Sequence, residues 1–113
     1  MAKTISIIDD DKAMLDVVQV LLEDEGYSVL TYTKSSDFLK ALHTSNTDIV
    51  ILDNTIGITS GKNLADEVKK YVSIPVLMIS GQSDVIHHPT IDAFIKKPFS
   101  IDLLLNTVQK YLT

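Results

Sequence analysis

Residues 48–53 read DIVILD, a run of four aliphatic residues between two carboxylates. A continuous apolar run of this length is typical of a strand that is buried on both faces, as in the middle of a parallel sheet. Asp53 ends the run, at a place where an unpaired carboxylate would be costly to desolvate. The stretch therefore predicts a central strand with a functional polar group at its carboxyl end.

Four further runs of strand length lie on either side of this stretch, and segments of helical periodicity separate most of them. The five predicted strands cover residues 4–8, 27–32, 48–52, 74–79 and 93–96. Alternation of strands and helices is the pattern of a parallel α/β sheet. We therefore expect one α/β domain over residues 1–113.

Four helices are predicted between and after these strands. The first ends near Gly26 as its C-cap, Ser35 or Ser36 caps the second, the third covers residues 62–71, and Ser100 caps the last. The side chains expected on their buried faces are Met14, Val17, Val18, Leu21 and Leu22 in the first helix; Phe38, Leu39 and Leu42 in the second; Leu64, Val68 and Tyr71 in the third; and Leu103, Leu104, Val108 and Leu112 in the last.

The connection between the fourth and fifth strands is short. Twelve residues, 81–92, separate Ser80 from Ala93, and Pro89 is one of them. A helix of about 11 residues with a loop of roughly 2 to 6 residues on each side does not fit there. We expect a turn or two of helix at most, or irregular chain, in this crossover, and a loop over residues 54–60.

The composition narrows the function class. The chain has 113 residues, 45% of them hydrophobic, with a net charge of -5, which suits one soluble, cytoplasmic domain. Every basic residue is Lys, and an acidic chain without Arg is not expected to bind nucleic acid directly. The lack of Cys excludes disulfides and thiol chemistry. The apolar runs are far shorter than the roughly 20 residues of a membrane helix, so no membrane partner is expected.

Polar side chains follow four of the predicted strands. Asp9 and Asp10 come after the first, Asp53 after the third, Ser80 after the fourth and Lys97 after the fifth. The carboxyl ends of parallel strands meet at one edge of a sheet. Clustered carboxylates repel one another unless a cation lies between them, and oxygen ligands favour Mg²⁺ over zinc or copper. The pattern predicts a phosphoryl and metal site.

Each of these signals has a plainer explanation when taken alone. Carboxylates after a strand usually open a helix, most lysines lie at the surface, and a serine at a strand end is common in turns. Lys96 is the better candidate for a surface lysine, because strand alternation sends it and Lys97 to different faces. His43 is expected at the surface, and His87 and His88 in a solvated loop rather than a metal site.

The order Asp-Asp, Asp, Ser, Lys-Pro resembles the receiver domain of two-component response regulators over essentially the whole chain. The matching segments are IIDDD at residues 7–11, IVILD at 49–53, Gly61 eight positions later, IPVLMIS at 74–80 and FIKKPF at 94–99. The resemblance implies a flavodoxin-like, doubly wound α/β fold with five parallel strands in the order 2-1-3-4-5. The short crossover would leave its fourth helix shortened or missing.

The resemblance also implies the chemistry of the site. Asp53 would be the phosphoacceptor. Asp9, Asp10 and Asp53 would hold Mg²⁺ together with the backbone carbonyl of Thr55. Lys97 would pair with a phosphoryl oxygen. A receiver of this kind catalyses only its own phosphorylation and slow dephosphorylation, so no further enzymatic activity is expected.

The resemblance implies a switch and partners as well. Ser80 would hydrogen-bond a second phosphoryl oxygen, and the ring of Phe94 would turn inward as Ser80 moves. Thr55 and Gln82 occupy positions that tune the loss of the phosphoryl group. The phosphodonor would be a sensor histidine kinase or a histidine phosphotransfer protein, and the receiver would control a fused output domain or a protein target.

Two features depart from the family pattern. Gly57 stands where the family usually has Pro, which should leave the loop after Asp53 more flexible. The short crossover at residues 81–92 alters or removes the face through which receivers commonly signal, so we expect another face or the crossover itself to carry the output.

The Lys97–Pro98 bond is a candidate for the cis form.

Other function classes compete with this one. A receiver-like docking module would bind its partner regardless of phosphorylation, although it would have no need of clustered carboxylates. A phosphatase with an aspartate nucleophile would normally carry a second acid two positions later, where Thr55 stands. A nucleotide-hydrolysing fold is disfavoured because the chain has no Gly-x-x-x-x-Gly-Lys loop.

Overall fold

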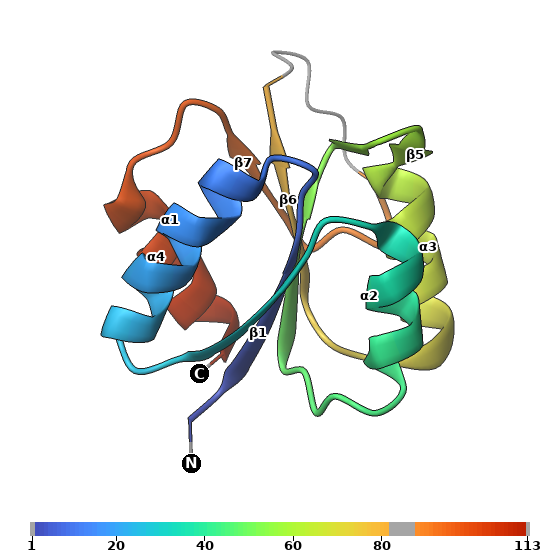
Figure 1. Ribbon diagram of the computed structural model, residues 1–113, viewed down its shortest axis with the longest axis horizontal. Coiled ribbons are helices and arrows are strands. Elements are labelled where there is room, and N and C mark those ends of the chain that lie inside the picture. The colour runs from blue at the N-terminus through green and yellow to red at the C-terminus, as the bar shows by residue number, and fades with distance from the viewer. Residues whose placement is uncertain (1, 82–87, 113) are drawn as a thin grey trace.

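The computed structural model describes residues 2–81 and 88–112, which form a five-stranded parallel sheet with helices on both faces (Figure 1). The strands of this sheet are β1 (Thr4–Ile8), β2 (Ser28–Tyr32), β3 (Ile49–Asp53), β6 (Val76–Ser80) and β7 (Ala93–Lys96). Their order is β2-β1-β3-β6-β7. Since β6 and β7 are the fourth and fifth strands of the sheet, the expected order 2-1-3-4-5 and the flavodoxin-like fold are confirmed.

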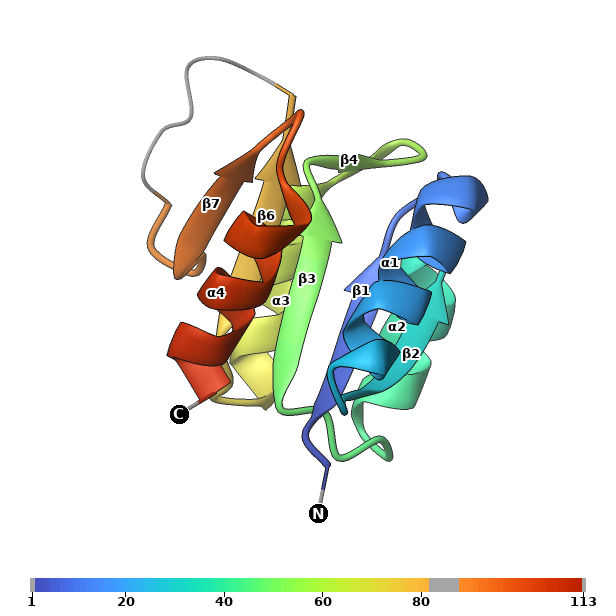
Figure 2. The ribbon, with the colours of Figure 1, turned by 90° about the vertical axis from the view of Figure 1, so that its left-hand side faces the viewer.

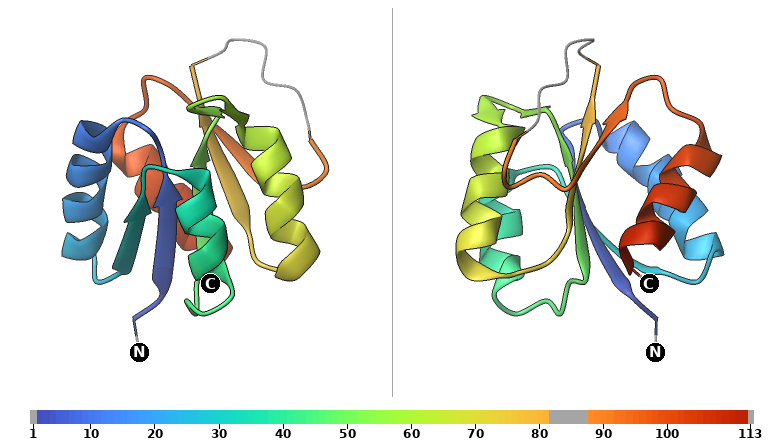
Figure 3. Two further views of the ribbon diagram at one scale, coloured as in Figure 1. Left: turned by 45° about the vertical axis from the view of Figure 1, so that its right-hand side comes forward. Right: turned by 180° about the vertical axis from the view of Figure 1, so that it is seen from behind.

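The helices of the described residues pack in two layers. They are α1 (Lys12–Asp24), α2 (Ser35–Leu42), α3 (Gly61–Tyr71) and α4 (Ile101–Leu112). The first and last cover one face of the sheet, and α2 and α3 cover the other (Figures 2 and 3). None of these described helices is long and apolar enough to cross a bilayer.

The central strand is buried on both faces, as its apolar run predicts. Ile49 and Ile51 join the core beneath α1 and α4, whereas Val50 and Leu52 join the core beneath α2 and α3. All four side chains are fully buried. Successive side chains of a strand point to opposite faces, so one short segment anchors both halves of the core.

Side-chain caps fix where three helices begin. Asp11 accepts a hydrogen bond from the Met14 amide at the start of α1, at 3.2 Å. Ser60 caps α3 in the same way, and the Ser100 hydroxyl accepts from the Leu103 amide at 3.1 Å before α4. These caps satisfy N–H groups that have no partner inside the helix. The expected role of Ser100 is confirmed. The cap expected from Ser35 or Ser36 was wrong, because the N-cap of α2 is Lys34, which makes no side-chain cap hydrogen bond.

Four helical side chains that the sequence placed in the core are exposed, and those predictions were wrong. The exposed residues are Val17, Leu21, Tyr71 and Leu103. The buried face of α1 is made by Leu15, Val18 and Leu22, so the apolar side chains beside it turn outward. Leu103 precedes the buried Leu104 by one position and therefore points to a neighbouring face. Tyr71 ends α3 and contacts the exposed His43 edge-on, with ring centroids 4.8 Å apart.

A small hairpin forms within the loop that the sequence predicted over residues 54–60. Its strands, β4 (Thr55–Ile56) and β5 (Thr59–Ser60), pair antiparallel. Gly57 and Ile58 make the two-residue turn between them, and Gly57 has φ +62°. A positive φ at the first turn position suits glycine, and such turns match the twist of a hairpin. Gly57 thus supplies the positive φ that this turn requires.

The crossover from β6 to β7 contains no helix in its described part, which consists of Gly81 and residues 88–92. This agrees with the expected short crossover. Residues 82–87 lie outside the described residues, and with them the predictions made for Gln82 and His87.

Candidate functional site

The strand ends bring the polar residues of the sequence pattern to one edge of the sheet (Figure 2). Asp9 follows β1, Asp53 and Ser80 end β3 and β6, and Lys97 follows β7. Backbone hydrogen bonds hold these ends together. The Asp9 amide donates to the Tyr32 carbonyl at 3.1 Å, and the Lys97 amide donates to the Ser80 carbonyl at 2.8 Å.

Three carboxylates form the centre of the site. One oxygen from each of Asp9, Asp10 and Asp53 lies within 4.8 Å of the others. Asp9 is 1% exposed, the Asp53 side chain is 14% exposed, and Asp10 lies at the surface. The cluster therefore runs from solvent into the core, which gives an ion a path from water to the buried oxygens.

Lys97 pairs with Asp53. Its Nζ donates to Asp53 Oδ1 at 2.9 Å. Partial burial by itself lowers the pKa of the Lys97 ammonium, but the hydrogen bond to Asp53 and the surrounding carboxylates outweigh that effect, and the pKa is raised. Lys97 is thus a fixed cation of the site. Lys96 is exposed and the Lys97–Pro98 bond is cis, as expected.

The Asp9 carboxylate is buried with one oxygen unpaired. Its Oδ1 accepts from the Asp11 amide at 2.9 Å, and its Oδ2 is the one buried side-chain polar atom of the described residues without a hydrogen-bond partner. Burial is the main reason that the pKa of Asp9 is raised to about 6. The charges of Asp53 and Asp10 add to the rise, whereas the Asp11 amide and Lys97 oppose it. A hard divalent cation fits here, because it supplies the missing partner and offsets the repulsion.

The start of α3 lies directly against the strand that carries the central acid. A Cβ atom at Gly61 would overlap the carbonyl oxygen of Asp53 and the terminal methyl of Met78. The Gly61 amide also donates to the Asn54 carbonyl at 2.8 Å. Only glycine allows this close approach of two backbone segments, and the approach fixes the chain on either side of Asp53.

Ser80, Thr55 and Phe94 are the remaining described residues of the predicted site. Ser80 is buried at the end of β6. Thr55 lies in β4, two positions after Asp53, and its side chain is exposed. Phe94 pairs with Met78 across β6 and β7 and packs, partly buried, on the core beneath α2 and α3.

Residues 5–109 match the response regulator receiver domain family. The chain belongs to this family. It is 32% identical over 104 residues to the regulatory protein VanR of Enterococcus faecium, a match that covers 88% of the chain and 45% of VanR. The receiver thus spans about half the length of that curated relative.

Solved structures resemble the receiver over almost its whole length. A CheY-like response regulator receiver domain protein from Methanospirillum hungatei JF-1 has 25% sequence identity and a TM-score of 0.90, with 99% of this chain and 94% of that chain covered. The response regulator TrrA from Thermotoga maritima, solved in complex with Mg²⁺-BeF, has 28% identity and a TM-score of 0.87, with 97% and 99% covered.

Sequence reasoning missed one donor at the edge of the receiver's acidic cluster. The backbone amide of Gly57 donates to Asp10 Oδ2 at 3.1 Å. The types of residue in a sequence do not show which backbone amide will donate to a side chain. The only available signal was that Gly57 replaces the usual Pro, which has no amide hydrogen.

A second polar cluster of the receiver joins the crossover to α3. His88 Nε2 and Thr90 Oγ1 both hydrogen-bond Asp66 Oδ1, at 2.9 and 2.7 Å, and Lys69 pairs with Asp92 at 3.0 Å. His88 lies outside the helices and strands, as expected, but it is partly buried and paired with Asp66, so it is less solvated than predicted. Among the described residues, these groups form no second metal-ligand set.

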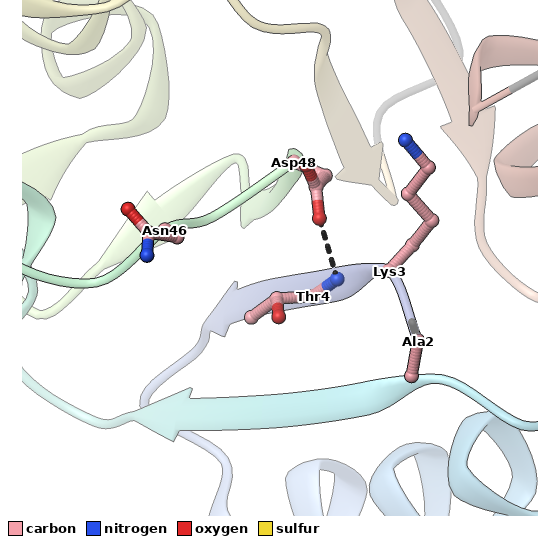
Figure 4. Close-up of a pocket in the computed structure, with 5 residues that line it drawn as sticks. All are labelled: Ala2, Lys3, Thr4, Asn46 and Asp48. Atoms are coloured by element: carbon pink, nitrogen blue, oxygen red, sulfur yellow. Dashed lines mark hydrogen bonds between the residues drawn. The ribbon is translucent and has the colours of Figure 1, made fainter.

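A surface pocket of about 340 Å³ lies at the opposite edge of the sheet, where β1 begins (Figure 4). Its lining residues are Ala2, Lys3, Thr4, Asn46 and Asp48. The Asp48 carboxylate already accepts from the Thr4 amide at 2.8 Å, and the Lys3 and Asn46 side chains extend to opposite sides of that bond. The pocket therefore lacks the convergent charged groups that distinguish the acidic cluster.

Proposed function

We propose that this receiver accepts a phosphoryl group on Asp53 and holds Mg²⁺ beside it. One observation carries the proposal: Asp53 lies within 4.8 Å of two further carboxylates and 2.9 Å from Lys97 Nζ. Asp9, Asp10 and Asp53 would ligate the ion together with the backbone carbonyl of Thr55. These are the oxygen donors that Mg²⁺ prefers.

In the proposed reaction, a carboxylate oxygen of Asp53 attacks the phosphorus of a phosphohistidine. An O–P bond forms, the P–N bond breaks, and the imidazole nitrogen keeps the electron pair of the broken bond. Lys97 holds one Asp53 oxygen by a hydrogen bond, and its charge offsets the negative charge that gathers on the phosphoryl oxygens. When bound, Mg²⁺ supplies further electrostatic stabilisation of those oxygens.

Ser80 and Phe94 would convert the added charge into a change of shape. Ser80 lies at the same sheet edge as Asp53, and a phosphoryl group with about two negative charges would attract its hydroxyl. Movement of Ser80 would leave space for the partly buried Phe94 ring to turn inward. Phe94 offers no hydroxyl to a partner, so the change would be read through shape and apolar contact.

The proposal includes partners. The phosphodonor would be a sensor histidine kinase or a histidine phosphotransfer protein, and the recipient of the signal would be a fused output domain or a protein target. The net charge of -5 and the lack of Arg disfavour direct contact with nucleic acid. We further propose that residues 1–113 form one receiver domain and that this domain is located in the cytoplasm.

Acetyl phosphate with Mg²⁺ tests the proposal, because it needs no cognate donor. Intact-mass measurement should show one added phosphoryl group on the wild type and none on Asp53→Asn. Mg²⁺ with beryllofluoride should raise the melting midpoint of the wild type only, since a ligand stabilises the state that it binds. A wild type that neither gains the group nor responds to the mimic would favour the docking module instead.

A further inference from the structure

The Gly57 amide connects the hairpin after Asp53 to an acid in the loop that follows β1. It donates to Asp10 Oδ2 at 3.1 Å, across 47 positions of sequence. From this contact we infer that Gly57 is a positioning residue, whose amide holds the Asp10 carboxylate in place for Mg²⁺. The inference rests on the proposed function and adds to it a residue that acts through Asp10.

Asp10 needs such support more than the other acids do. Asp9 is held by burial, and Asp53 is held by Lys97, whereas the Asp10 side chain lies at the surface. A free surface carboxylate loses rotamer entropy when it binds an ion. A hydrogen bond to one oxygen removes that freedom beforehand and leaves the other oxygen for the ion.

The hairpin places this amide by its backbone geometry. β4 and β5 pair Ile56 with Thr59, so Gly57 and Ile58 form a two-residue turn. The φ of +62° at Gly57 lies in a region that proline cannot reach, since its ring fixes φ near about −65°. Proline would therefore remove both the donor and the turn that aims it. β4 begins two positions after Asp53, so a single short segment sets the spacing of two ligands.

Magnesium affinity of the unphosphorylated protein provides the first test. Gly57→Pro should weaken Mg²⁺ binding about tenfold, the lower end of the range for partners that orient metal ligands. Gly57→Ala keeps the amide hydrogen and should lose less affinity, although a side chain strains the positive φ. Gly26→Ala is the matched control, because Gly26 has φ +97° and a Cβ there would have no heavy atom within 4 Å. Melting without Mg²⁺ reports any general loss of stability.

Hydrogen exchange provides a second test that leaves Gly57 unchanged and needs no metal. In metal-free wild type the Gly57 amide should exchange slowly, and Asp10→Ala should make it exchange faster while the amides of the sheet keep their rates. Equal Mg²⁺ affinities of Gly57→Pro and Gly57→Ala would overturn the inference, and so would a Gly57 amide that is indifferent to Asp10→Ala. If the wild type itself bound no Mg²⁺, the proposed function would fail, whereas the exchange result would still report on the contact.

Discussion

Gly61 and Asp53 approach each other so closely that a methyl group on Gly61 would overlap the Asp53 carbonyl oxygen. The contact lies between the first residue of α3 and the last residue of β3. It ties the helix to the strand end that carries the central acid, and both stability and the geometry of the acidic cluster depend on it.

Gly61→Ala should therefore destabilise the fold by about 1–3 kcal/mol, the usual cost of forcing extra atoms into a packed site. Urea unfolding followed by circular dichroism would measure the change. Gly81→Ala is the matched control, because a Cβ atom at Gly81 would meet no heavy atom within 4 Å. Equal stabilities of the two variants would show that the α3 start can shift without cost.

Asp9 should make the metal-free protein less stable at neutral pH than in mild acid. The pKa of Asp9 is about 6 in the folded chain and 3.8 ordinarily. When the folded pKa of an acid is raised, ionisation opposes folding, so this group costs stability as pH rises from about 4 to about 6, by on the order of 3 kcal/mol. Urea unfolding with a chelator at about pH 4 and about pH 7.5 would measure the loss.

Asp9→Asn is the informative variant for that measurement. It keeps the shape of the side chain but cannot ionise, so it should be more stable than the wild type at neutral pH without metal and should show a flatter pH profile. Mg²⁺ should stabilise the wild type and have little effect on the variant. A wild-type profile that rises from mild acid to neutral pH would contradict this account of Asp9.

Lys97→Met should weaken the response to beryllofluoride while the fold is retained. The ammonium makes a charge-assisted hydrogen bond with Asp53, and such bonds contribute about 1.5–3 kcal/mol, or roughly ten- to a hundredfold in affinity. Titration of the mimic at fixed Mg²⁺, read by melting midpoint, measures the effect. Lys96→Met tests the adjacent exposed lysine and should behave like the wild type. Similar losses in both variants would point to overall charge rather than to this contact.

Asp66→Asn should reduce stability at neutral pH by weakening the link between α3 and the crossover. Hydrogen bonds from Thr90 and then from His88 lower the pKa of Asp66. With a lowered pKa in the folded chain, the acid stabilises the fold above its ordinary pKa of 3.8, and the effect is lost as pH falls below that value. Because the side chain is 45% exposed, we expect only about 0.5–1 kcal/mol.

Glu67→Gln is the neighbouring control for Asp66→Asn. Glu67 pairs with Lys70 on the same helix, and within residues 2–81 and 88–112 it makes no hydrogen bond or ion pair with the crossover. Comparison of urea midpoints at neutral pH and at about pH 3 would separate the two sites. If the Asp66 and Glu67 variants had the same urea midpoints at both pH values, the hydrogen bonds from the crossover to Asp66 would contribute nothing to stability.

The sheet and its acidic edge were predictable because both follow from strand periodicity. Apolar runs of strand length gave the five strands, and the residues that end those runs must meet where parallel strands end. Asp9, Asp53, Ser80 and Lys97 are therefore placed by backbone topology, with no need to know any side-chain conformation.

The errors arose where local pattern does not decide the outcome. Val17 and Leu21 are apolar and have helical spacing, but the packing of α1 selects a neighbouring face. The Gly57 amide depends on a turn conformation, and the pairing of His88 with Asp66 joins residues 22 positions apart. Interactions of these kinds are settled only when the chain has folded.

β7 is an outer strand of the sheet, and among the described residues only β6 pairs with it. An outer strand leaves one row of backbone groups available to other chains, which can template aggregation. Here that row is four residues long, ends in the exposed Lys96 and is followed by Pro98 after one residue. A charged residue, a short strand and a proline, which has no N–H to donate, each hinder the pairing of an edge strand with another chain. An outer strand with these features is a poor template for pairing with another chain.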